Sequence, residues 1–163
     1  MEEIEKALKR WLFGAERIII VGVGNELRKD DFVGMKIVKD LKGKLNHLDK
    51  IHLIECGTVP ENFIEPIAKL KPTHILIIDA ALLGLNPGSM RLVNPEEIVG
   101  STISTHKLPL SLFCEYLAKI TNAKIAVLAI QPKETCFGEG LSEDLRYTVS
   151  VAVSILTRIL SNV

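Results

Sequence analysis

The sequence RIIIVGVGNELRKDDFVG occupies residues 17–34. Its first seven residues form a β-branched run that ends in glycines, which predicts a strand buried on both faces. Residues 31–41 then carry apolar side chains at helical spacing. A buried strand followed at once by an amphipathic helix is the usual first unit of a mostly parallel α/β sheet.

The same alternation continues along the rest of the chain. Further strands are predicted at residues 51–55, 74–80, 89–94 and 124–130, and helices at residues 58–70, 108–120 and 142–160. We therefore expect one three-layer α/β/α domain over residues 1–163, with helices on both faces of the sheet. Residues 1–16 add an N-terminal amphipathic helix. Thr58 to Glu61 has the form of a capping box.

Composition excludes several classes of protein. The 163 residues are 47% hydrophobic and 25% charged, and 20 basic residues balance 20 acidic ones, so no electrostatic footprint for nucleic acid is expected. The N-terminus lacks the pattern of a signal peptide, and no apolar run approaches the ~20 residues that span a bilayer. We expect a cytoplasmic monomer without membrane insertion. The three cysteines form no CxxC pair, which argues against a structural zinc site.

The loop after the first strand resembles a nucleotide-binding turn only in part. Gly22 and Gly24 fit a GxGxxG pattern, but Leu27 stands where the third glycine is needed for close helix packing. The loop then reaches Asp30 and Asp31, whose charges would repel a pyrophosphate. Nicotinamide and flavin nucleotides are therefore not expected to bind. We interpret Asp30 as a helix N-cap and Asp31 as a functional residue.

Two further candidates lie at the same edge of the predicted sheet. Asp79 ends the most apolar strand, where it could either cap the next loop or act chemically. His106 comes just before or inside the first turn of a helix, where the helix dipole favours the neutral imidazole. His47, His52 and His74 are more simply explained by structural roles.

Asp31, Asp79 and His106 together would make a mixed oxygen and nitrogen site with open coordination positions. Such a site suits nickel, zinc or iron acting as a Lewis acid, and the ligand set does not choose among these metals. Alternatives based on a nucleophile are weaker because no GxSxG motif occurs. Among the thiols, Cys136 in a loop is the best nucleophile candidate, whereas Cys114 is interpreted as a buried thiol.

Several segments in order resemble the hydrogenase maturation endopeptidases. Residues 22–34 match the family signature G-x-G-N-x-L-x-x-D-[DE]-x-x-G, and residues 56–58, 77–80 and 104–110 (CGT, IIDA and STHKLPL) match later motifs. Residues 84–98 and 128–132 are similar to the HycI branch, which serves the formate-hydrogenlyase type of hydrogenase. The resemblance extends over nearly the whole chain after the N-terminal helix.

The resemblance implies a fold, an activity and a site. The fold would be a phosphorylase/hydrolase-like, five-stranded sheet of order 2-1-3-5-4 with its fourth strand antiparallel. The activity would be removal of the C-terminal extension from the precursor of a nickel–iron hydrogenase large subunit after nickel insertion. Asp31, Asp79 and His106 would contact the nickel, which the substrate itself could supply and another divalent metal could replace.

Two rival functions and one departure from the family stay open. The chain could be a nickel-sensing module that docks on the large subunit without cutting it, or a small-molecule hydrolase on a similar sheet. Where relatives often carry D-G-G-T, this chain has Cys56 in the sequence ECGT. Cys56 could line the cleft and alter metal preference, or simply replace a small residue.

Overall fold

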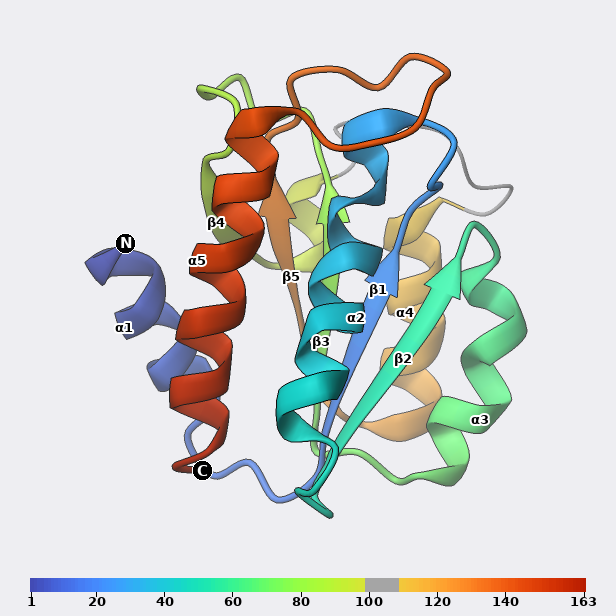
Figure 1. Ribbon diagram of the computed structural model, residues 1–163. Coiled ribbons are helices and arrows are strands. Elements are labelled where there is room, and N and C mark those ends of the chain that lie inside the picture. Colours follow the sequence, from blue (N-terminus) through green and yellow to red (C-terminus); the bar gives the residue numbers. More distant parts are fainter. Residues whose placement is uncertain (99–108) are drawn as a thin grey trace.

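The computed structural model describes residues 1–98 and 109–163, and within them five strands form one sheet (Figure 1). The strand order is β2-β1-β3-β5-β4, and every neighbouring pair is parallel except β4 and β5, which run antiparallel. This confirms both the predicted order and the antiparallel fourth strand. The strands are β1 (Ile18–Val23), β2 (Ile51–Gly57), β3 (His74–Ala80), β4 (Met90–Val93) and β5 (Lys124–Ile130).

Helices cover both faces of the sheet, as predicted (Figure 1). One face packs against α1 (Glu2–Trp11), α2 (Val33–Leu45) and α5 (Glu143–Leu160). The other packs against α3 (Ile64–Lys69) and α4 (Leu110–Thr121). Short 3₁₀ turns lie at η1 (Lys29–Phe32), η2 (Pro60–Phe63) and η3 (Pro95–Ile98). None of the helices in the described ranges is long and apolar enough to cross a membrane.

The continuous apolar runs follow from burial on both sides. In β1, Ile18 and Ile20 face the α2 and α5 layer, while Ile19 and Val21 face the α3 and α4 layer. All seven residues of β3 are buried. Each such aliphatic side chain stabilises the fold by roughly 1.5–3 kcal/mol, so the sheet needs no alternation with polar residues.

Two glycines bring α2 directly onto the sheet. A Cβ at Gly34 would overlap the carbonyl oxygen of Ile78 in β3, and a Cβ at Gly22 would lie 2.8 Å from the carbonyl oxygen of Gly34. The expectation that Leu27 prevents a close helix approach is therefore wrong, because Gly34 provides that approach further along the chain. Leu27 itself lies in the loop and is partly exposed.

Two helix starts differ from their predicted form. The capping box from Thr58 to Glu61 is not made, since Val59 is the N-cap residue of η2 and no side-chain cap hydrogen bond forms. Likewise, the helix predicted from Asp31 begins as the 3₁₀ turn η1 before α2 starts.

Candidate active site

The loops that follow β1, β2, β3 and β5 meet at the carboxyl edge of the sheet, at the top of Figure 1. In open α/β sheets this edge is where ligands bind. Asp31 lies in η1, seven residues beyond the start of the loop after β1, and Asp79 is the penultimate residue of β3. Because β1 and β3 are direct neighbours, the loop that carries Asp31 follows the strand next to the one that carries Asp79.

The loop after β1 folds back to hold the carboxylate of Asp31. Asp31 is fully buried, and its Oδ2 accepts a hydrogen bond from the backbone N–H of Asn25 at 3.0 Å. Asn25 in turn accepts the N–H of Leu27 through its side-chain Oδ1 at 2.9 Å. Gly24, at φ 148°, allows this close return, because a Cβ there would overlap the carbonyl oxygen of Asp31. Asn25 stands inside the quoted motif, but no sequence pattern revealed its role.

Asp79 is buried on the face of the sheet that packs against α4. It follows Ile75 and Ile77 on that face, and its Oδ1 accepts the N–H of Ala80 at 2.9 Å. Burial, followed by the nearby carboxylates of Glu96 and Asp79, raises the pKa of Cys114 in α4 to about 12. The thiol of Cys114 therefore stays protonated, in agreement with its interpretation as a buried thiol.

The packing of α2 brings Asp31 toward Asp79. Gly34, three residues after Asp31, lies against the carbonyl of Ile78, the residue before Asp79. Burying ionised carboxylates is costly unless other groups compensate for the lost hydration. Two such acids at a ligand-binding edge make a candidate site for a cation or for acid–base chemistry.

His106 lies outside the described residues, so its predicted place beside the two acids stays a prediction. In residues 1–98 and 109–163, no group of three or more His, Cys, Asp or Glu side chains is arranged to hold a metal ion. The two acids present are hard oxygen ligands that fit part of a divalent-metal site.

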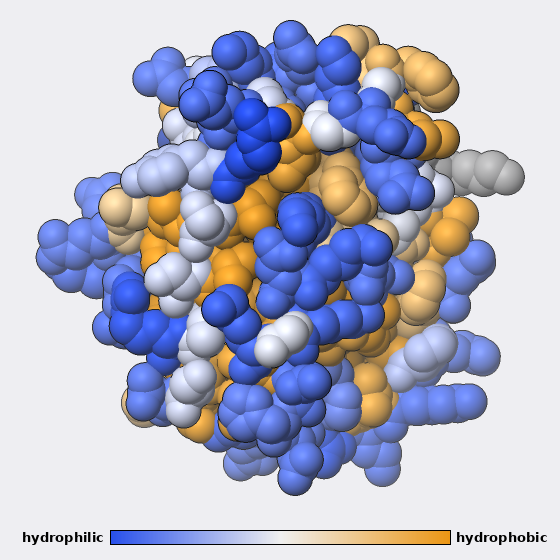
Figure 2. All heavy atoms as spheres, in the orientation of Figure 1, coloured by the Kyte–Doolittle hydropathy of each residue, from blue (hydrophilic) through white to orange (hydrophobic). Residues whose placement is uncertain are grey.

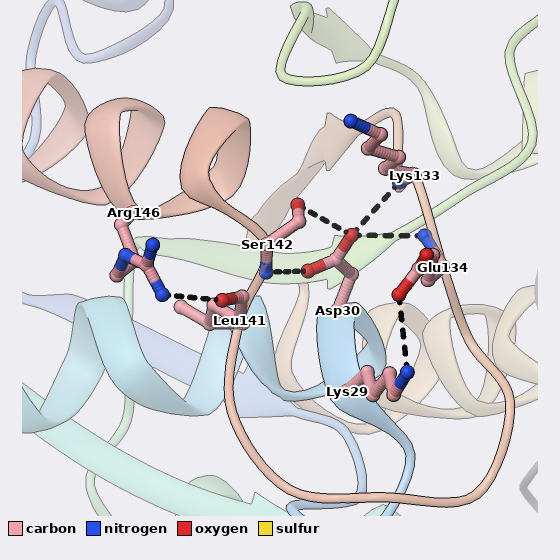
Figure 3. Close-up of polar contacts among 7 residues, drawn as sticks. All are labelled: Lys29, Asp30, Lys133, Glu134, Leu141, Ser142 and Arg146. Atoms are coloured by element: carbon pink, nitrogen blue, oxygen red, sulfur yellow. Dashed lines mark hydrogen bonds and ion pairs between the residues drawn. The ribbon is translucent and has the colours of Figure 1, made fainter.

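Asp30 has a different role from its neighbour (Figure 3). It does not cap its own helix, contrary to the sequence interpretation. Its carboxylate instead accepts four hydrogen bonds from the segment after β5: from the N–H groups of Lys133 (2.9 Å), Glu134 (3.0 Å) and Ser142 (2.7 Å), and from the hydroxyl of Ser142 (2.8 Å). Asp30 thus fixes the β5–α5 loop, residues 131–142, against η1.

Gln131 also holds a loop in place at the carboxyl edge of the sheet. Its side-chain Oε1 accepts the backbone N–H of Leu83 at 2.6 Å, which ties the loop after β3 to the end of β5. No sequence pattern predicted this role of Gln131. Only the LAIQP motif of the family resemblance contained it.

Cys56 is part of the apolar core at the end of β2. Burial, followed by the negative charge of Glu61, raises its pKa to about 12. A thiol with such a pKa stays protonated at neutral pH and is a poor nucleophile. The structure therefore favours the interpretation of Cys56 as a small-residue replacement. Cys136, by contrast, is exposed in the β5–α5 loop.

Comparison with known proteins adds three findings. A family model described as hydrogenase maturation protease (HycI) matches residues 35–159. A putative hydrogenase maturation protease of Methanocaldococcus jannaschii is 38% identical over 155 residues, which cover 91% of each chain. The hydrogenase 3 maturation protease of Escherichia coli K12 is 31% identical over 134 residues, covering 80% of this chain and 83% of the relative.

The fold agrees with this assignment. The crystal structure of a nickel–iron hydrogenase maturation protease HycI from Thermococcus kodakarensis superposes with a TM-score of 0.88 at 29% identity, covering 96% of this chain and 99% of that one. Asp79 lies inside the region that the family model matches, whereas Asp31 precedes it. Sequence, fold and relatives agree that this chain belongs to the hydrogenase maturation protease family.

Proposed function

We propose that the protein is an endopeptidase that removes the C-terminal extension of a nickel-loaded nickel–iron hydrogenase large-subunit precursor. Asp31, Asp79 and His106 would contact the metal during the reaction. The observation that supports this most is the pair of buried carboxylates at one edge of the sheet, in a chain whose relatives are named as maturation proteases.

The two carboxylates are oriented before any substrate arrives. The N–H of Asn25 holds Asp31, and the N–H of Ala80 holds Asp79, so neither side chain must be ordered on binding. Two fixed anionic oxygens attract a partly coordinated cation and repel phosphate and carboxylate groups. A divalent metal bound there would supply Lewis-acid polarisation of the scissile carbonyl.

Nickel is proposed to arrive with the precursor, which holds it partly through its own thiolates. Asp31 and Asp79 would then distinguish a filled precursor from an empty one, because only the filled one presents a cation to them. Zinc or iron could occupy the same mixed set of oxygen and nitrogen ligands. This discrimination requires no second, allosteric site in the protease.

The test compares cleavage of precursor with and without nickel at equal protease concentration, followed by mass spectrometry. We expect cleavage only of the filled precursor. Asp31→Asn keeps the shape but removes the charge, and it should slow cleavage at least about a hundredfold. Asp49→Asn, which changes an exposed acid elsewhere on the surface, serves as the matched control and should cut normally.

Each rival function gives a distinct result in the same experiment. Binding of the filled precursor without any cleavage would identify a docking module. Neither binding nor cleavage, with hydrolysis of small esters or amides, would identify a small-molecule hydrolase. Equal cleavage of filled and empty precursor would show that the metal is not recognised.

A further inference from the structure

Four large apolar side chains are exposed on the four loops at the carboxyl edge. They follow β1, β2, β3 and β5 in turn, and we call them the apolar rim: Leu27, Val59, Leu82 and Phe137. Phe137 is 81% exposed. Figure 2 shows apolar groups reaching the surface near the top of the molecule, among the polar side chains of this edge. The rim therefore lies on the same loops that carry or adjoin Asp31 and Asp79.

Leu27 and Phe137 are carried by two segments that are hydrogen-bonded to each other. The N–H of Gly138 donates to the carbonyl of Leu27 at 2.8 Å, and the N–H of Lys29 donates to the carbonyl of Gly138 at 3.0 Å. These contacts place the two loop segments that carry Leu27 and Phe137, far apart in sequence, side by side.

The hydrogen bonds accepted by Asp30 hold the β5–α5 loop, which carries Phe137 (Figure 3). These four hydrogen bonds hold both ends of the β5–α5 loop, at Lys133 and Glu134 and again at Ser142. A loop whose backbone is already held loses less conformational entropy when one of its exposed side chains binds a partner. Exposed, preorganised aromatic residues are frequent anchors of protein interfaces.

We propose that the apolar rim is the docking surface for an apolar segment of the precursor next to its cleavage site, with Phe137 as the principal anchor. The proposal rests on the proposed function. The rim spans four separate loops, which suits a protein surface better than a small molecule. The chain has a formal net charge of zero, so bulk electrostatic attraction does not account for partner recognition. A second copy seated there would cover Asp31 and Asp79.

The chain offers a closely matched control for the anchor. Phe13, in the turn that leads into β1, is 84% exposed and lies toward the opposite, amino edge of the sheet. Replacing either phenylalanine by alanine removes the same exposed ring. Neither change should alter the melting temperature, since neither ring is buried in the core.

The experiment measures steady-state cleavage of the full-length, nickel-loaded precursor. Phe137→Ala should raise KM by about tenfold with kcat retained, because it removes binding shared by ground state and transition state. Leu82→Ala should raise KM by a smaller factor, and Phe13→Ala should leave KM unchanged.

Three results would overturn the proposal. One is an unchanged KM in Phe137→Ala, and another is an equal rise in Phe13→Ala. The third is a wild-type dimer that Phe137→Ala converts to a monomer in sedimentation, since the rim would then join two copies of this chain. Failure of the wild-type protein to cut the precursor would instead count against the proposed function, so the two failures are distinguishable.

Discussion

Asp30 and Asp31 are adjacent acids in one turn, both fully buried, yet they face different surroundings. The carboxylate of Asp30 accepts four hydrogen bonds from the β5–α5 loop, while that of Asp31 accepts the N–H of Asn25 at the sheet edge. One residue therefore holds the loops around the candidate site, and its neighbour is a candidate residue of that site.

Asp30→Ala should lower the free energy of unfolding by roughly 3–5 kcal/mol, because it leaves three backbone N–H groups of the β5–α5 loop without the carboxylate that accepts their hydrogen bonds. Asp40→Ala removes a surface ion pair with Lys36 and should cost less than about 1 kcal/mol. Urea denaturation of both variants measures the difference. Similar midpoints for the two variants would mean that Asp30 does not hold the loop.

The sequence identified both acids but assigned Asp30 the wrong partner. An acid at the start of a helix usually accepts hydrogen bonds from the backbone N–H groups of that helix's first turn. This rule considers only residues that are close in sequence. The partners of Asp30 lie 103 to 112 residues away, and no periodicity or motif reveals such a pairing. Asp79 was visible from sequence because an acid stands out at the end of an apolar run. Asn25 and Gln131 were not, since each acts through backbone groups of neighbouring loops.

At the scale of elements, α2 lies close to β1 and β3 because of Gly22 and Gly34. The strands themselves were predictable. Strands buried on both faces consist of continuous β-branched residues, and such a run can be recognised in the sequence without knowledge of distant contacts. The two 3₁₀ turns that precede α2 and α3 were not predictable, because their geometry depends on where the preceding loop meets the sheet.

Two glycines of α2 allow a direct test of this packing. Gly34→Ala would force the helix away from the carbonyl of Ile78 and should destabilise the protein by about 3 kcal/mol. In Gly43→Ala a Cβ meets nothing within 4 Å, so helix propensity should stabilise the protein by roughly 0.5–1 kcal/mol. Thermal unfolding of the pair gives shifts of opposite sign, and a tolerated Gly34→Ala would contradict the close packing.

At the scale of the whole molecule, two apolar cores flank the sheet, and neither depends on the candidate site. The fold is therefore expected to be independent of metal, in contrast to small domains that fold only around an ion. Sequence composition already indicated this, because a chain of this length and hydrophobic content can bury a full core.

Treatment with a chelator should shift the melting temperature by less than about 2 °C, the shift that roughly 1 kcal/mol produces in a chain of this size. His106→Ala should likewise abolish cleavage of the precursor with little change in melting temperature. Differential scanning calorimetry measures both. A large loss of stability on chelation would show that the resting protein holds a structural metal.

The large sequence separation between Asp30 and its hydrogen-bond donors also has a consequence for synthesis on the ribosome. The segments from β1 to β3 pair with neighbours that emerge soon after them, so they can begin to assemble while the chain is still growing. The donors that hold Asp30 emerge more than a hundred residues later, the last of them at Ser142. Until then the carboxylate of Asp30 must remain hydrated, and the turn that carries Asp31 lacks its support. The candidate site is thus completed only after most of the sheet has emerged, so under the proposed function a nascent chain should not cleave a precursor before Ser142 has emerged.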